Sequence, residues 1–290
     1  MVALGHSITR ATASRAWPGA ANLEVSEVWM HKGLWAGETF LNGVESNGIT
    51  SMLCEPGAIT GNPHRLAEMK GKSFQGSVVL GTGFMLSPSE ADELVGLDSC
   101  NDDVLAWYLS GDDLNSRPDQ SPSRKIINFA DWPLDRNSAP SGYEGPVAED
   151  YPHCLAIVRK KVLPQRAKSK RKVYRERWWQ FAEKQTRLYE SIAQFERTLV
   201  IPETTKYCAF ALYPVNIVFS HMTKVITFDT EDVFALLTSS VHEAWVRHYA
   251  STLETRLKYT TSDVFETFPF PRNTTGLVAF GRSYEECRQA

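Results

Sequence analysis

The densest group of side chains with a defined chemistry lies between Arg159 and Arg177. This stretch of nineteen residues holds ten basic side chains and a single acid, Glu176. Arg and Lys side chains neutralise DNA phosphates and release the counterions that surround them, and solubility alone does not require so high a density. We therefore favour phosphate contact over a solvated surface. The predicted phosphate-contacting residues are Arg166, Lys168, Lys170, Arg171, Lys172, Arg175 and Arg177.

Charge is distributed unevenly along the chain, whose formal net charge is -3. Residues 1–150 hold 10 Lys and Arg against 20 Asp and Glu, while residues 151–290 hold 21 against 14. The second half is therefore the part that suits an anionic partner. Two tryptophans, Trp178 and Trp179, adjoin the basic stretch, and we predict that they pack in the core.

Other chemistries find little support in the sequence. Gly81-Thr82-Gly83 lacks the third glycine of a dinucleotide fingerprint and the lysine of a phosphate-binding loop, so it is predicted to be a structural turn. The seven histidines and five cysteines show no metal-ligand spacing. His248 is predicted to be a core residue. We predict no catalytic residue and no metal site.

Length and composition favour a folded protein. The chain has 290 residues, 42% of them hydrophobic, and can bury a sizeable core. No apolar run reaches the roughly 20 residues that cross a bilayer, and residues 1–20 lack a signal-peptide pattern. A cytoplasmic protein with reduced cysteines is expected.

Periodicity and turn residues indicate mixed secondary structure. Strands are predicted at 23–29, 77–80, 124–130, 206–213 and 223–228. A helix with a capping box should begin after Ser87, and a second should be capped by Asp229 or Thr230 and carry the apolar stripe Phe234, Leu237, Val241, Trp245 and His248. Residues 174–198 have helical spacing, and 138–151 are a predicted loop.

These elements predict an α+β fold with a mixed sheet and helices. We expect residues 1–70 to be strands and a linker, residues 71–275 to be the main domain, and residues 276–290 to be a tail.

Four strings of the sequence carry a family resemblance. They are 72–86 (KSFQGSVVLGTGFML), 109–128 (LSGDDLNSRPDQSPSRKIIN), 175–183 (RERWWQFAE) and 263–271 (DVFETFPFP). In this order they resemble the C-terminal target-recognition region of the MmeI-like, type IIL restriction–modification enzymes. In that family one polypeptide also carries a nuclease and an S-adenosylmethionine-dependent adenine-N6 methyltransferase. Residues 10–29 look like the last strands of such a methyltransferase, which makes 1–70 a remnant of its sheet.

The resemblance implies sequence-specific recognition of double-stranded DNA without catalysis. The family's methyltransferase needs a glycine-containing cofactor loop and an Asn-Pro-Pro-aromatic motif, and this sequence contains no Pro-Pro pair. S-adenosylmethionine is therefore expected only in a methyltransferase domain outside this chain, and no cofactor is expected within it. A separate methyltransferase or nuclease polypeptide is a candidate partner.

Base-reading residues are predicted at two places. The turn from Pro202 to Tyr207 looks like the place where relatives carry such residues, which gives Glu203, Thr204, Thr205, Lys206 and Tyr207 as candidates. Asn115, Arg117 and Arg124 are further candidates, with structural turn bonding as an equal alternative. Lys72, Ser73 and Gln75 are predicted to be structural.

Two alternatives stay open at this point. The chain could be one subunit of a split adenine methyltransferase that is active only with a partner. It could also be a module that binds an acidic protein, or a decayed gene product. Steep salt dependence of duplex binding would favour DNA recognition over the second alternative.

Overall fold

The computed structural model describes residues 5–20, 23–51, 53–57, 63–253 and 256–289. The chain divides into two compact units, residues 1–64 and 65–290. The predicted α+β class with mixed sheets is confirmed. No helix among the described residues is long and apolar enough to cross a membrane.

The first unit is a small sheet in the order β2-β1-β3-β4. Its strands are β1 (Ser7–Ala16), β2 (Glu24–His31), β3 (Thr39–Leu41) and β4 (Val44–Ser46). β1 pairs with β2 in antiparallel and with β3 in parallel orientation. Among the described residues of this unit, the cluster of buried apolar side chains consists of Ile8, Ala11 and Ile49. This core is small for a sheet of four strands.

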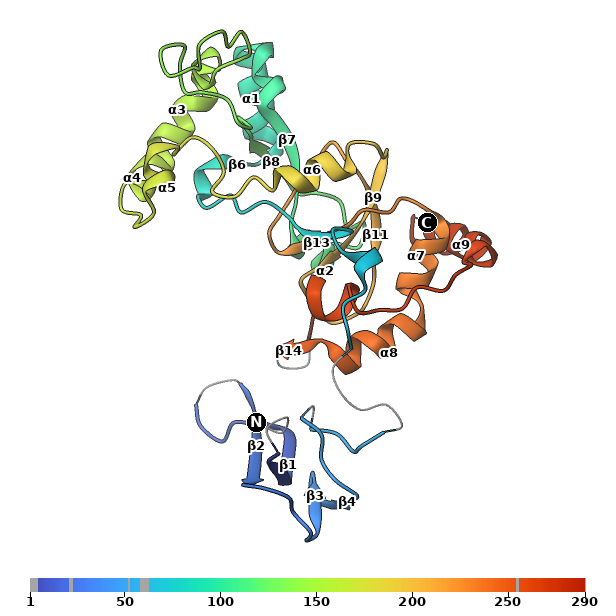
Figure 1. The fold of residues 1–290 in the computed structure, drawn as a ribbon. Coiled ribbons are helices and arrows are strands. Elements are labelled where there is room, and N and C mark those ends of the chain that lie inside the picture. The colour runs from blue at the N-terminus through green and yellow to red at the C-terminus, as the bar shows by residue number, and fades with distance from the viewer. Residues whose placement is uncertain (1–4, 21–22, 52, 58–62, 254–255, 290) are drawn as a thin grey trace. The chain divides into compact units, whose positions relative to one another are not determined.

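The second unit contains two four-stranded sheets (Figure 1). One core cluster takes side chains from both sheets, with Leu109 and Phe219 from the first and Val200 and Val225 from the second. The first sheet has the order β12-β7-β8-β6 and packs beneath α1 (Pro88–Leu97) and α3 (Pro152–Lys161). Its strands are β6 (Met85–Leu86), β7 (Leu105–Leu109), β8 (Arg124–Ile127) and β12 (Val218–Phe219). The capping box predicted for α1 is confirmed, since Ser87 accepts from the Glu90 amide and Glu90 accepts from the Ser87 amide.

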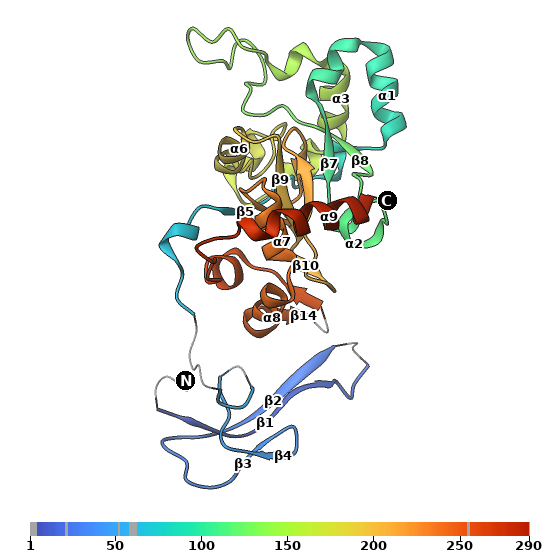
Figure 2. The same ribbon diagram turned by 90° about the vertical axis from the view of Figure 1, so that its right-hand side faces the viewer.

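The other four-stranded sheet is antiparallel, with the order β11-β9-β13-β5. Its strands are β5 (Ser73–Gln75), β9 (Arg197–Pro202), β11 (Ala211–Pro214) and β13 (Thr223–Ile226). Helices α7 (Glu231–Thr238), α8 (Ser240–Tyr249) and α9 (Val278–Gln289) lie beside it (Figure 2). A third, three-stranded sheet has the order β10-β15-β14, with β10 (Thr204–Thr205), β14 (Ser251–Leu253) and β15 (Arg256–Lys258).

Short helices complete the second unit. They are α2 (Gly111–Ser116), α4 (Leu163–Arg166), α5 (Lys172–Glu176) and α6 (Thr186–Ile192), with 3₁₀ segments at Ala67–Met69, Thr82–Phe84, Ser99–Val104, Ala148–Asp150 and Thr275–Leu277 and a π segment at Thr261–Phe265.

The long helix predicted over 174–198 is wrong. The backbones of Val78 and Glu183 exchange two hydrogen bonds of 2.9 and 3.1 Å, which holds this part of the chain extended. Gln185 then takes a left-handed conformation with φ of 58°. The helical parts of this range are therefore the end of α5 and the whole of α6. The strand predicted over 77–80 is reduced to single bridges at Ser77 and Val78.

The helix predicted after Asp229 or Thr230 is interrupted. Ser239 is extended, with ψ of 155°, and caps the start of α8. The break rotates the second half of the predicted stripe, so His242 is buried and His248 is exposed. The prediction of a core role for His248 is therefore wrong.

Residues 276–290 are not an extended tail, because most of them form α9. Its Glu285 pairs with Arg197 at 3.0 Å, and Arg288 donates to the carbonyl oxygen of Phe210. Gly281 lies so close to α7 that an added Cβ would fall 1.9 Å from the Glu231 carbonyl oxygen. Only glycine allows the two helices to approach so closely.

Candidate nucleic-acid interface

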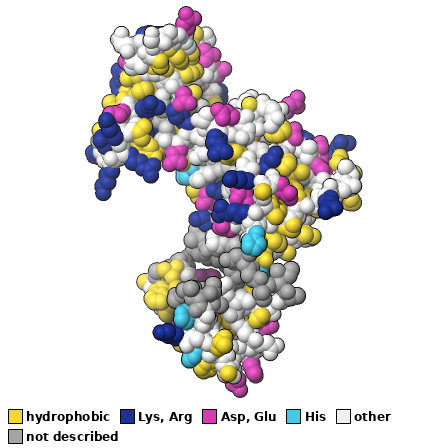
Figure 3. Space-filling model, in the orientation of Figure 1, with side chains coloured by type: hydrophobic (Ala, Val, Ile, Leu, Met, Phe, Trp, Pro, Cys, Tyr) yellow, Lys and Arg dark blue, Asp and Glu magenta, His cyan; other side chains and the backbone are white. Residues whose placement is uncertain are grey.

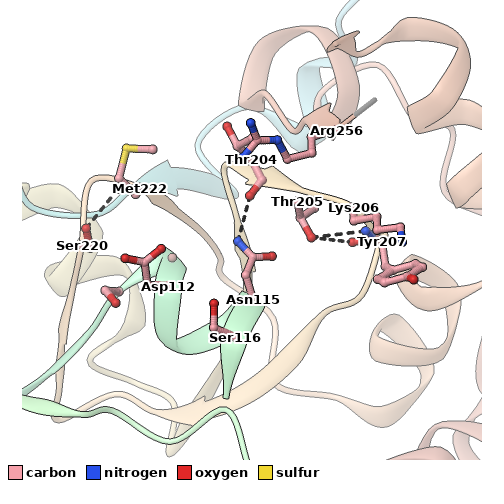
Figure 4. A pocket seen from close by; sticks show the side chains of 12 residues that line it. Asp112, Asn115, Ser116, Thr204, Thr205, Lys206, Tyr207, Ser220, Met222 and Arg256 are labelled. Atoms are coloured by element: carbon pink, nitrogen blue, oxygen red, sulfur yellow. Dashed lines mark hydrogen bonds between the residues drawn. The ribbon is translucent and has the colours of Figure 1, made fainter. Parts of the chain in front are cut away.

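The two predicted base-reading segments meet in one pocket of about 630 Å³ (Figure 4). Helix α2 forms one wall, and β10 with the turn after it forms another. The lining residues are Ser110, Gly111, Asp112, Asn115, Ser116, Thr204, Thr205, Lys206, Tyr207, Ser220, Met222 and Arg256. Asn115 donates from Nδ2 to the carbonyl oxygen of Thr204 at 3.0 Å, across a separation of 89 residues. The structure therefore brings together two segments that the sequence kept apart.

Helix α2 is held in place by a capping box. The Asp113 carboxylate accepts from the Ser110 amide at 2.9 Å and from its hydroxyl at 2.7 Å, and the Asp113 amide donates to Ser110 Oγ. Asp113 is buried, so it serves the helix and not a ligand. This arrangement fixes the direction in which Asn115 leaves the helix.

The backbone of residues 203–207, which we call the β10 turn, is hydrogen-bonded on both sides. The Glu203 amide donates to Met222 O, and its carbonyl oxygen accepts from the Tyr259 amide, both at 2.7 Å. Thr204 and Thr205 pair with Lys258 and Leu257 of β15. Because the main chain is held, the side chains that follow are presented from a rigid turn.

Glu203 does not point freely into this pocket, although it was a predicted base-reading residue. Its carboxylate lies 2.7 Å from Lys224 Nζ and 3.6 Å from Lys258 Nζ. The Glu203 and Lys224 side chains are only 16% and 9% exposed. A role in base reading for Glu203 stays a prediction, but any such role is coupled to this ion pair.

The open side of the pocket carries donors and an aromatic ring. Tyr207 is 62% exposed, and Lys206 Nζ lies 5.2 Å from the centre of its ring. Arg256 enters from β15 and Asp112 from α2. Hydrogen-bond donors, acceptors and a flat ring are the groups that read base edges.

Arg117 and Arg124 do not line this pocket. Arg117 pairs with Asp119 at 3.2 Å and donates to Ser121, which is turn bonding. Hydrogen bonds from Ser121 and Arg117 lower the pKa of Asp119 to about 2. Arg124 leaves β8 toward the sulfur of Met85. Both arginines remain exposed, and their contact with DNA stays a prediction.

The basic stretch runs from α3 through α4 to α5, and the phosphate contact predicted for one of its residues, Arg166, is corrected by the structure. Arg166 is 2% exposed and donates to the carbonyl oxygens of Leu80, Val79 and Gln180 at 2.9, 2.7 and 3.2 Å. Burial lowers the pKa of its guanidinium. Arg166 cannot reach a phosphate from this position, because its side chain is buried and its Nε and Nη2 donate to carbonyl oxygens of the core.

The other six predicted phosphate-contacting residues are exposed. Figure 3 shows Lys and Arg side chains gathered over α4 and α5. Arg171 Nη1 lies 3.7 Å from Glu183 Oε1, and Lys172 Nζ lies 3.5 Å from Glu176 Oε1. These exposed ion pairs are weak and can be exchanged for phosphates. Arg175 donates to the Ser169 carbonyl oxygen, so part of its guanidinium braces the loop.

The tryptophans and the glycine turn are structural, as predicted. Trp178 and Trp179 are buried in the core, where Trp179 Nε1 donates to the Trp132 carbonyl oxygen. Gly83 lies against α3, where an added Cβ would be 2.4 Å from Lys161 Cβ. Within the described residues, no group of three His, Cys, Asp or Glu is placed to hold a metal ion.

Comparison with known families finds a match for the part of the chain that carries the basic stretch and β10. Residues 149–272 match the MmeI target recognition domain. The resemblance seen in the sequence is thereby confirmed. A solved structure described as "Type IIL restriction-modification enzyme MmeI in complex with DNA" has the same fold, with a TM-score of 0.74 and 17% identity over 99% of this chain. The aligned region covers 38% of that chain. No curated protein gives a significant match.

Sequence reasoning missed part of the pocket. Ser220, Met222 and Arg256 follow no motif and lie outside both predicted segments. They reach the pocket only through strand pairing. Helix α2 lies outside the matched residues 149–272, so the pocket is built by more of the chain than the family match covers.

Proposed function

We propose that this chain recognises a specific sequence in double-stranded DNA for a restriction–modification system. The observation that carries the proposal is the joining of Asn115 and the Thr204–Tyr207 turn in one polar pocket. A rigid backbone that presents several donors and acceptors together is what discrimination between base edges requires. The match of residues 149–272 to the MmeI target recognition domain supports the same role.

The proposal assigns different tasks to two surfaces. The exposed basic residues over α4 and α5 hold phosphates, which gives affinity without sequence information. The pocket between α2 and β10 contributes the preference for particular bases. The two sets share no residue, so variants can separate affinity from specificity.

The test is selection from randomised duplexes with the full 290-residue chain, followed by titrations of the selected duplex over a range of salt concentrations. A reproducible selected sequence and a steep fall of affinity with salt are expected. Binding that is steep in salt but selects no sequence would reject sequence recognition. Absence of duplex binding would favour a module that binds an acidic protein, or a product without function.

A second candidate role is as a subunit that docks with a methyltransferase, and the first unit favours it. β2 is an edge strand with large apolar residues on both faces. Val28 and Met30 pair with the core residues Ala11 and Ile8 and share their face, whereas Trp29 lies opposite Arg10 on the other face and is 48% exposed. Strands that are apolar on both faces are typical of the interior of covered sheets.

We therefore propose that an α/β methyltransferase domain completes this sheet and holds S-adenosylmethionine, with no cofactor bound by this chain alone. Co-purification with a polypeptide that carries the glycine loop and the Asn-Pro-Pro-aromatic motif tests the docking. Replacement of Trp29 and Met30 by Ser should abolish it, while replacement of Lys168 and Lys170 by Gln should not. Saturable S-adenosylmethionine binding by the isolated chain in calorimetry would refute the cofactor assignment.

A further inference from the structure

The carboxamide of Asn115 has a defined orientation in the pocket. A carbonyl oxygen only accepts hydrogen bonds, so the atom that faces Thr204 O at 3.0 Å must be the amide nitrogen. Oδ1 is consequently turned away from Thr204 (Figure 4). Among the described residues no donor is hydrogen-bonded to this Oδ1.

The remaining hydrogen-bonding capacity of Asn115 is one acceptor and one donor. Nδ2 carries two hydrogens, of which the Thr204 carbonyl takes one, while Oδ1 keeps its lone pairs. An adenine presents the complementary pair in the major groove, a donor at N6 and an acceptor at N7. Guanine presents two acceptors there and cytosine one donor, so neither complements both groups of the carboxamide.

We propose that Asn115 reads an adenine of the recognised duplex through N6 and N7. This inference rests on the proposed function, and it extends the reading surface to α2, outside the matched residues 149–272. The hydrogen bond to Thr204 positions the carboxamide and links it to β10. Asn115 therefore lies beside the β10 turn on the reading surface, and the recognised sequence contains an A·T pair at the position that Asn115 faces.

The first experiment is selection from randomised duplexes with the wild-type chain and with Asn115→Ala. The wild type should require an A·T pair at one position, and Asn115→Ala should relax that position by about 5- to 150-fold while the others keep their preference. Asn273→Ala is the matched control, because the Asn273 side chain is also hydrogen-bonded, to the Thr275 amide at 3.0 Å, and does not line the pocket.

The second experiment separates base reading from a merely structural role. The selected adenine is replaced by 7-deazaadenine, which lacks the N7 acceptor, and binding is measured for both proteins. Wild type should lose affinity with the modified duplex, whereas Asn115→Ala should bind both duplexes equally. Equal losses in the two proteins would overturn the proposal, as would unchanged selection by Asn115→Ala. A wild type that selects no sequence at all would instead reject the proposed function.

Discussion

Neutralising the exposed part of the basic stretch should lower the salt dependence of DNA binding by a calculable amount. Each phosphate contact contributes about 0.9 to the slope of log affinity against log salt concentration. Replacing Lys168, Lys170, Arg171 and Lys172 by Gln removes four exposed cations. The slope should therefore become shallower by at most about 3.6, and by less where Arg171 and Lys172 keep their ion pairs with Glu183 and Glu176.

Fluorescence anisotropy of labelled duplexes between about 50 and 200 mM salt measures this slope. The loss of affinity should be the same for selected and unselected duplexes, because phosphates carry no base information. Circular dichroism and thermal unfolding check that the variant is folded. An unchanged slope in a folded variant would refute phosphate contact and leave the stretch as a solvated surface.

Three further predictions concern buried groups. Arg166→Met should lower the free energy of unfolding by about 3 kcal/mol, because it leaves three carbonyl oxygens without their donor, and should leave the salt slope of any folded fraction unchanged. Burial lowers the pKa of His242 from 6.5 to about 3, so the folded state resists protonation of this side chain. The resulting stability is present above about pH 6.5 and is lost as the pH falls below that value. Urea titrations should show that the free energy of unfolding falls by about 2 kcal/mol at about pH 5, and that His242→Gln lacks this loss. Glu203→Lys should destabilise the chain by leaving Lys224 without its partner, and Glu203→Lys with Lys224→Glu should restore stability. If Glu203 also reads a base, the sequence selected by the double variant should change from C·G toward G·C at one position. An identical selected sequence would remove Glu203 from the reading surface.

Local sequence signals predicted the elements that local chemistry determines. The Ser87–Glu90 capping box starts α1, and the alternation in 223–228 corresponds to β13. The periodicity of 174–198 failed because spacing alone cannot report that Glu183 pairs with Val78, more than a hundred residues earlier. The helix α9 within the expected tail 276–290 likewise depends on distant residues, since it is held by Arg197 and by the backbone of Phe210.

Residue type predicted the candidate site better than it predicted the environment of each residue. Arg166 has the same chemistry in the sequence as its exposed neighbours, and only the fold shows that its donors are used by core carbonyl oxygens. The charge of Glu203 gave no sign of Lys224, because their ion pair depends on the register between β9, β13 and the turn. Burial and pairing across strands were therefore what the sequence could not supply.

In this pocket, the groups that hold the fold differ from the side chains that face DNA in our proposal. The β10 turn is held by main-chain hydrogen bonds to Met222 and Tyr259, which any residue except proline at position 203 can make. Lys206 and Tyr207 extend from this turn without supporting it, and Tyr207 is mostly exposed. Substitutions at these two positions therefore leave the scaffold intact, whereas Glu203 and Asn115 are tied to other elements by their side chains. A change of specificity at Lys206 or Tyr207 requires one substitution, but a change at Glu203 requires a compensating change at Lys224.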